Sequence, residues 1–214
     1  MEDRAEAKAF EPFPELLPQF KAAFVGVYDG HGGASVAEYV VKNLRGHIIR
    51  QWRSLFHARL GRETVDEAGR VADDPFSPEE RDEAEKLSLR LLPTAMVDGF
   101  ASAEKCIEDR YKRTGNDDGT TAVVAILVHN RLYMAHCGDS RAVMVRGAME
   151  VPLTRDHKPN NPQERKRIES TGHCVKKIGS TWRVDGNLAV ARSLGDCSHK
   201  VSCCTVEKSI TPSH

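Results

Sequence analysis

The chain has 214 residues, of which 40% are hydrophobic and 29% are charged, as in an ordinary globular protein. Its 31 basic residues balance its 31 acidic residues, which argues against the strong overall field that draws proteins to nucleic acid or membrane surfaces. No apolar run approaches the roughly 20 residues that cross a bilayer, and residues 1–20 lack the apolar core of a signal peptide. We expect a monomer in the cytoplasm or nucleus that binds neither nucleic acid nor membrane.

The cysteines carry no sign of a metal site. Six of them, at positions 106, 137, 174, 197, 203 and 204, include no CxxC pair, which is the usual spacing in structural zinc sites. Because no export signal is visible, we expect free thiols in a reducing compartment.

The first half of the chain predicts one strand and three helices. Residues 21–28 form a short, apolar, β-rich run that predicts a buried strand. Apolar residues then recur at helical spacing, which predicts an amphipathic helix over residues 34–50. Ser77-Pro78-Glu79-Glu80 has the capping-box pattern with proline at the first helical position, so a helix should run from about 78 to 91. A third helix should carry Met96, Phe100, Ala103, Ile107 and Tyr111 on one face.

The second half of the chain consists mainly of strand patterns. Residues 120–128, 131–137 and 141–147 are three strand candidates. Because the links between them are short, we expect consecutive strands to be antiparallel neighbours. A second cap at Asn161-Pro162 predicts a short helix that ends near Gly172. Strands and helices without regular alternation predict an α+β fold.

The stretch Asp29-Gly30-His31-Gly32-Gly33 joins the first strand to the first helix. A carboxylate beside an exposed glycine carbonyl offers hard oxygen ligands suited to Mg²⁺ or Mn²⁺. A histidine between them titrates near neutrality and could pass a proton to a leaving group. The alternative is a tight turn in which Asp29 caps the following helix, and these five residues alone leave both interpretations open.

The glycines do not form a nucleotide-binding loop, because neither G-x-G-x-x-G nor G-x-x-x-x-G-K-[ST] occurs there. Gly138-Asp139-Ser140 places a second acid at the tip of an expected hairpin. Aspartate is common in turns because its side chain hydrogen-bonds the nearby backbone. Asp139 taken alone therefore indicates a structural turn residue.

Several motifs follow one another in a characteristic order. They are MED at residues 1–3, YDGHGG at 28–33, DDGTTAVVAIL at 117–127, AHCGDSRAVMV at 135–145, LTRDHKP at 153–159 and NLAVARSLGD at 187–196. This order resembles the metal-dependent Ser/Thr protein phosphatases of type 2C, the PPM family. The resemblance predicts a partial catalytic domain over residues 1–197. Within it, residues 53–92 look like an acidic insertion, and residues 198–214 form an unmatched tail.

The resemblance implies a four-layer αββα sandwich, in which two antiparallel sheets are flanked by helix pairs, with a dinuclear Mg²⁺ or Mn²⁺ site at one end. Asp29 matches the aspartate that bridges both metals, and Gly30 matches the glycine whose carbonyl binds one of them. Glu2 and Asp3 match the acidic pair of the family's first motif. Asp139 matches an acid of a third, more weakly held metal.

The activity implied by the resemblance is hydrolysis of phosphoserine and phosphothreonine in proteins by a metal-activated water that attacks phosphorus directly. His31 matches the proposed general acid. The expected catalytic residues are therefore His31 and Asp29, and the expected partners are phosphorylated proteins.

Two family features are missing from the sequence. The family has a phosphate-binding arginine upstream of MED and two metal-binding aspartates downstream of LGD, whereas Asp196 of LGD is the last aspartate here and matches no ligand. Because hard cations need several oxygen ligands, we expect little activity from a chain truncated in this way. The alternative function is a non-catalytic module that binds phosphoproteins.

Overall fold

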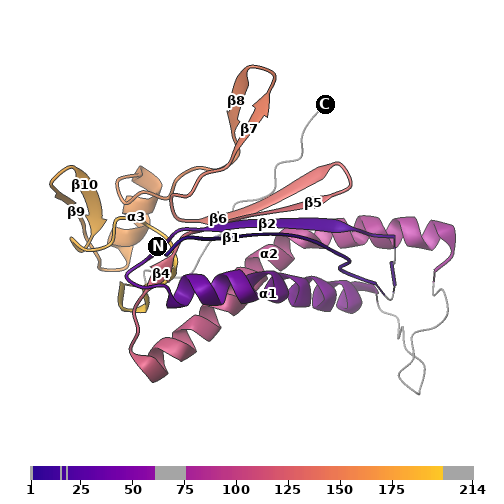
Figure 1. Cartoon of the computed structure of the whole chain (residues 1–214), viewed down its shortest axis with the longest axis horizontal. Coiled ribbons are helices and arrows are strands. Elements are labelled where there is room, and N and C mark those ends of the chain that lie inside the picture. The colour runs from indigo at the N-terminus through magenta and orange to yellow at the C-terminus, as the bar shows by residue number, and fades with distance from the viewer. Residues whose placement is uncertain (1, 15, 18, 61–75, 200–214) are drawn as a thin grey trace.

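The computed structural model describes residues 2–14, 16–17, 19–60 and 76–199. Its centre is an antiparallel four-stranded sheet in the order β1-β2-β5-β6, and two long helices, α1 and α2, cover one face of this sheet (Figure 1). The α+β class is confirmed. These elements are β1 (Arg4–Phe10), β2 (Ala22–Tyr28), β5 (Ala122–Val128), β6 (Arg131–Cys137), α1 (Ser35–Leu60) and α2 (Pro78–Thr114).

The two faces of the main sheet differ because side chains alternate along each strand. Phe24 and Tyr28 of β2 are fully buried on the side of the helices. On the opposite face, Val25, Val27 and Leu127 are 48%, 45% and 47% exposed. Of the four layers expected, the described residues thus supply one helix pair and one complete sheet.

The helices α1 and α2 run antiparallel and pack closely. His47 of α1 hydrogen-bonds Ser102 of α2, while Trp52, further along α1, donates to the carbonyl of Ser88, which lies earlier in α2. The helices approach most closely at Gly99, where an added Cβ would lie 2.5 Å from a side-chain carbon of Ile48 and 2.7 Å from its Cα. A glycine is therefore required at this crossing.

Both helices are longer than the sequence predicts. α1 continues beyond residue 50 to Leu60, and α2 is one helix from Pro78 to Thr114, so the expected break between residues 91 and 96 is wrong. Pro93 lies inside α2, where it removes one backbone hydrogen bond. Leu92, Ala95 and Met96 are buried on both sides of it, and this continuous burial outweighs the local cost of proline.

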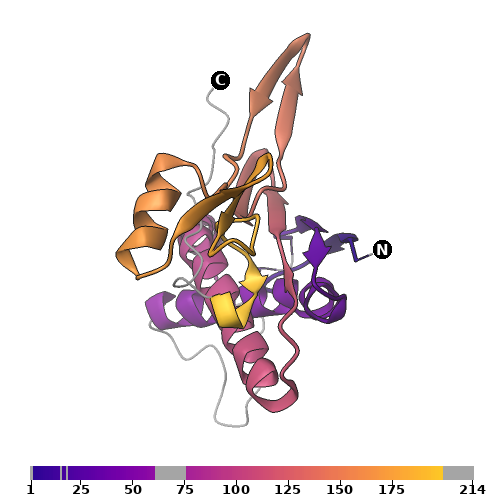
Figure 2. The ribbon, with the colours of Figure 1, turned by 90° about the vertical axis from the view of Figure 1, so that its left-hand side faces the viewer.

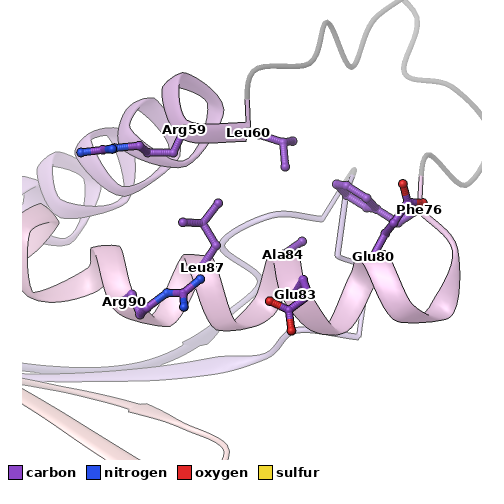
Figure 3. A pocket seen from close by; sticks show the side chains of 8 residues that line it. All are labelled: Arg59, Leu60, Phe76, Glu80, Glu83, Ala84, Leu87 and Arg90. Carbon is purple, nitrogen blue, oxygen red and sulfur yellow. The ribbon is translucent and has the colours of Figure 1, made fainter.

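The distal end of the helix pair, where α1 ends and α2 begins, encloses a cavity of about 330 Å³. Leu60 and Leu87 point into the space between the helices (Figure 3). The two outer parts of the expected insertion, residues 53–60 and 78–92, are thus helical, and residues 61–75 lie outside the described part of the chain.

The remaining elements are short and lie toward the other end of the helix pair. α3 packs on the β9-β10 hairpin around a small core of Ile168, Val175, Val184 and Ala191, and the β7-β8 hairpin projects away from the main sheet (Figure 2). The elements are β3 (Gly30–His31), β4 (Gly119–Thr120), β7 (Val143–Arg146), β8 (Met149–Pro152), α3 (Pro162–Ser170), β9 (Val175–Ile178), β10 (Thr181–Val184), β11 (Leu194–Gly195) and a 3₁₀ turn (Cys197–His199).

Two strand predictions need correction. β6 pairs with β5 across a two-residue link as expected, but it does not pair with β7, whose partner is β8. Asp139 therefore does not lie at a hairpin tip. β1 was not predicted, since its residues are small or charged, yet it pairs along its whole length with β2.

Among the described residues, Cys106, Cys137, Cys174 and Cys197 are free thiols. In the same part of the chain, no helix is both long and apolar enough to cross a membrane.

Candidate active site

A small three-stranded sheet in the order β11-β4-β3 gathers the main motifs. His31 of β3 lies opposite Gly119 of β4, and Gly119 lies opposite Gly195 of β11. The DGHGG, DDGTT and LGD motifs, which are far apart in sequence, therefore meet at the end of the main sheet where α1 begins. We call this region the site end.

Asp29 is held at the site end by its own backbone. Its N–H donates to the Thr121 hydroxyl at 3.2 Å, and its carbonyl accepts from the Thr121 N–H at 2.9 Å. Partial burial, together with the neighbouring carboxylates of Asp3 and Asp139, raises the pKa of Asp29.

The MED motif reaches the site through Gly30. A Cβ added to Gly30 would lie 2.8 Å from the carbonyl oxygen of Glu2, so only glycine allows the two segments to touch. Glu2 also contributes to the electrostatic environment of His31. The four predicted ligand positions Glu2, Asp3, Asp29 and Gly30 are thus brought together.

Asp139 approaches the same site from the loop after β6. The Thr121 hydroxyl, which accepts from Asp29, lies 2.6 Å from the Ser140 hydroxyl and so ties this loop to the DGHGG segment. The carboxylate of Asp139 is paired with the ammonium of Lys158.

The predicted ligands do not form a finished metal cage. Among the described residues, no group of three or more His, Cys, Asp or Glu side chains is arranged to hold an ion. The donor set is nevertheless the kind that Mg²⁺ and Mn²⁺ prefer, because it consists of carboxylate and carbonyl oxygens. Burial, and after it the carboxylates of Asp3 and Asp139, raises the pKa of Asp29, and a cation bound among these acids would relieve their repulsion. The residues fit the ions in the chemistry of their donor atoms.

His31 contacts an acid to which sequence reasoning assigned no role. Its Nε2 lies 2.9 Å from Oδ1 and 2.8 Å from Oδ2 of Asp196. Burial of the ring lowers the pKa of His31, but the hydrogen bond and charge of Asp196 and the nearby Asp29 and Glu2 outweigh burial, so the pKa is raised. No local pattern could have signalled this pair, because its members are 165 positions apart.

The start of α1 is capped by Asp118, not by Asp29. The Asp118 carboxylate accepts from the N–H of Val36 at 2.7 Å. The alternative in which Asp29 caps this helix is therefore wrong, and the Asp29 side chain is left for another role. A groove of about 490 Å³ lies beside this cap, lined by residues 32–35 and 115–118.

The comparisons with known proteins agree with this arrangement of motifs. A family model described as protein phosphatase 2C matches residues 6–213. The chain belongs to the protein phosphatase 2C family. The match includes most of the C-terminal segment that we expected to be an unmatched tail.

Two curated relatives in the protein phosphatase 2C family are plant proteins. Probable protein phosphatase 2C 55 of Oryza sativa subsp. japonica is 37% identical over 196 residues, which cover 92% of this chain and 42% of the relative. Probable protein phosphatase 2C 59 of Arabidopsis thaliana is 37% identical over 171 residues, which cover 80% of this chain and 44% of the relative. The chain spans less than half the length of these relatives.

Solved structures support the protein phosphatase 2C fold. A serine-threonine phosphatase 2C from Toxoplasma gondii aligns with a TM-score of 0.65 at 22% identity, covering 99% of this chain and 70% of that structure. A sex determining protein of C. elegans aligns with a TM-score of 0.62 at 23% identity, covering 91% and 40% respectively.

In this protein phosphatase 2C chain, a buried ion-pair cluster anchors the LGD segment. Glu164 of α3 is 4% exposed and accepts from Arg167 and Arg192 at 2.9 Å and 2.7 Å. These arginines hold the pKa of Glu164 below its usual range despite burial, which alone would raise it. Because Arg192 lies four positions before Asp196 in the sequence, the cluster fixes the segment that carries the partner of His31.

Proposed function

We propose that the protein is a metal-dependent phosphatase that hydrolyses phosphoserine and phosphothreonine in proteins. The observation that carries the proposal is the pairing of His31 with Asp196 directly beside Asp29, at the meeting point of three family motifs. A proton donor held next to an oxygen-rich cluster of acids suits phosphate-ester hydrolysis.

The metal ligands in this proposal are Glu2, Asp3, Asp29 and the carbonyl of Gly30, which would hold two Mg²⁺ or Mn²⁺ ions, with Asp139 serving a third. Such ions, when bound, supply an activated water and neutralise phosphoryl charge. Burial and the carboxylates of Asp3 and Asp139 raise the pKa of Asp29, and a cation bound beside it would favour its ionised form.

His31 acts in this proposal as the general acid that protonates the serine or threonine oxygen as it leaves phosphorus. The groove along residues 32–35 and 115–118 begins next to His31 in the sequence and offers room for a peptide. The adjoining Gly32 has φ 71°, a conformation that glycine adopts without strain, and no side chain stands there between the groove and the histidine. No observation favours the non-catalytic alternative.

The proposal is tested by calorimetric titration of the chain with Mn²⁺ and by Mn²⁺-dependent phosphate release from a phosphothreonine peptide. Asp29→Asn should weaken Mn²⁺ binding more than Asp139→Asn, because only Asp29 would contact both ions. Asp82→Asn, on the exposed surface at the distal end, is the matched control and should bind as the original chain does. Equal loss in the Asp29 and Asp139 variants, or no Mn²⁺ binding at all, would refute this assignment.

A further inference from the structure

We propose that Asp196 is a positioning residue that holds the ring of His31 so that Nδ1, rather than Nε2, delivers the proton to the leaving oxygen. This inference rests on the proposed phosphatase function for the identity of the reaction. It concerns a residue of the LGD motif that lies outside the predicted ligand and catalytic sets.

The contact geometry determines which nitrogen is engaged. Both carboxylate oxygens of Asp196 approach the same atom, Nε2 of His31, at 2.9 Å and 2.8 Å. An ionised carboxylate can only accept hydrogen bonds, so Nε2 carries a hydrogen and donates it to Asp196. The His31 side chain is 31% exposed, and Nδ1 is the nitrogen left to exchange a proton with substrate.

The carboxylate of Asp196 is itself held in place. Asp196 is 6% exposed, and the Ser193 hydroxyl donates to its Oδ2. Its backbone N–H donates to the carbonyl of Asp118 at 3.1 Å. These contacts restrict both the backbone and the side chain of Asp196, so the carboxylate has little freedom to follow a moving ring.

The backbone of Asp196 also has an unfavourable conformation. Its φ is 50°, in the left-handed region that residues other than glycine adopt only at a cost in backbone strain. Such strain persists where surrounding contacts over-determine the conformation, and it occurs often at functional sites. The strain here points the carboxylate at His31.

The facing strand leaves room for this carboxylate. A Cβ added to Gly119 would lie 2.3 Å from Oδ2 of Asp196, and Gly119 is the residue directly opposite His31 in β4. Any side chain at position 119 would displace the carboxylate from the ring. The DDGTT and LGD segments are thus both shaped around the contact between Asp196 and His31.

The chain contains a matched control for this pair. Asp185 also has φ 50° and contacts a histidine, His173, but through Nδ1 at 2.6 Å. This second pair lies beside the β9-β10 hairpin and outside the three-stranded sheet of the site. Because the two histidines engage opposite ring nitrogens, they should hold opposite tautomers.

The first test is nitrogen NMR of the histidine rings in the metal-free chain at one mildly alkaline pH, because the raised pKa of His31 leaves hydrogens on both ring nitrogens at lower pH. We expect a hydrogen fixed on Nε2 of His31 and on Nδ1 of His173. Asp196→Ala should release His31 to a mixture of tautomers and leave His173 unchanged, and Asp185→Ala should do the reverse. Asp196→Asn keeps an acceptor of the same shape and should retain part of the preference for a hydrogen on Nε2 of His31. It provides a second test in case the alanine variant does not fold. A His31 ring with its hydrogen on Nδ1 in the unaltered chain would overturn the proposal.

The second test compares two substrates in Mn²⁺. A phosphoserine peptide releases a basic alkoxide that needs a proton, whereas p-nitrophenyl phosphate releases a stable phenolate that does not. Since general acids contribute about 10²- to 10⁴-fold, Asp196→Ala should lower kcat roughly 10²-fold for the peptide and far less for p-nitrophenyl phosphate, with little change in KM. Asp185→Ala should not discriminate between the substrates.

The outcomes separate the two proposals. Equal losses of kcat on both substrates in Asp196→Ala would contradict a positioning role and indicate a purely structural one. If the unaltered chain binds no Mn²⁺ and hydrolyses neither substrate, the phosphatase proposal is refuted for this chain, while the NMR result still decides how Asp196 holds His31.

Discussion

The two ends of the antiparallel helix pair are built from different kinds of contact. At the distal end, α2 begins on a capping box in which Ser77 and Glu80 exchange hydrogen bonds at 3.3 Å and 2.9 Å, three positions apart. At the site end, α1 begins on the carboxylate of Asp118, which lies 82 positions from its partner Val36. Local contacts thus define the scaffold, and long-range contacts assemble the site.

The distal end and the site end also differ in the burial of their charged side chains. The pocket at the distal end is lined by apolar and charged side chains in equal number, and its charged members Arg59, Glu83 and Arg90 are exposed. The site end buries Asp118 and Asp196, which are 5% and 6% exposed, and each depends on a donor from another segment. Buried charged groups without their partners are costly, so the site end should respond more strongly to pH and to single substitutions.

The largest expected effect is loss of stability at the site end in acid. His157, 3% exposed, stacks on His136 with ring centroids 4.4 Å apart. Burial chiefly, together with His136 and the arginines at 167 and 192, lowers the pKa of His157 to about 4, against an opposing effect of Glu164.

The lowered pKa of His157 determines the direction in which the free energy of unfolding changes with pH. The unfolded chain binds this proton more readily, so the contribution is fully present above about pH 6.5 and is lost as pH falls toward 4. A shift of this size corresponds to roughly 3 kcal/mol of unfolding free energy. Urea unfolding at pH 7, 5.5 and 4 should show a steeper decline in the original chain than in His157→Asn, which can still accept from the N–H of Gly138.

Comparing these two chains cancels the other titrating groups. His31, whose pKa is raised, acts in the opposite direction in both, and Asp185, whose pKa is lowered to about 2, loses its contribution mainly below pH 4. Parallel declines in the two chains would show that His157 is not the responsible group.

The features that could be predicted from the sequence are those that depend on local contacts, and the features that were missed depend on long-range contacts. β2, the cap of α2 and the cap of α3 at Asn161 were predicted correctly, because each depends on neighbours within a few residues. The Asp118 cap and the contact between Asp196 and His31 were missed, since contacts over 82 and 165 positions leave no local periodicity.

Motif order provided information that periodicity could not. The residue types of Asp29, Gly30 and His31 left a metal site and a tight turn both open, and the resemblance assigned them to the site. In the folded chain they meet the LGD segment. Local reasoning failed at Pro93 and at the link between β6 and β7. There, packing of buried side chains and the choice of a more distant strand partner outweighed the local rule.

An intermediate effect is expected from removing the long-range cap. Asp118→Ala deletes a charged acceptor from the buried N–H of Val36, and hydrogen bonds to charged groups contribute about 1.5–3 kcal/mol. The loss should lower the urea midpoint and should also expose amides in the first turn of α1 to hydrogen exchange. Asp118→Asn keeps an acceptor and should lose less. Unchanged exchange at Val36 in the alanine variant would mean that the cap does not hold α1.

The smallest effect is expected at the local cap. Ser77→Ala removes one acceptor from the first turn of α2 and should cost about 1 kcal/mol, whereas Ser77→Gly should cost only a few tenths. Because Ser77 and Glu80 satisfy one another, faster hydrogen exchange should be confined to the start of α2. Mn²⁺ affinity and the His31 ring should stay as they are, since the hydrogen bond that Ser77→Ala removes lies within the capping box. A change at the site in Ser77→Ala would show that α2, which reaches from the capping box to the site end, transmits disturbances along its length, and the contrast between the two ends would then not hold.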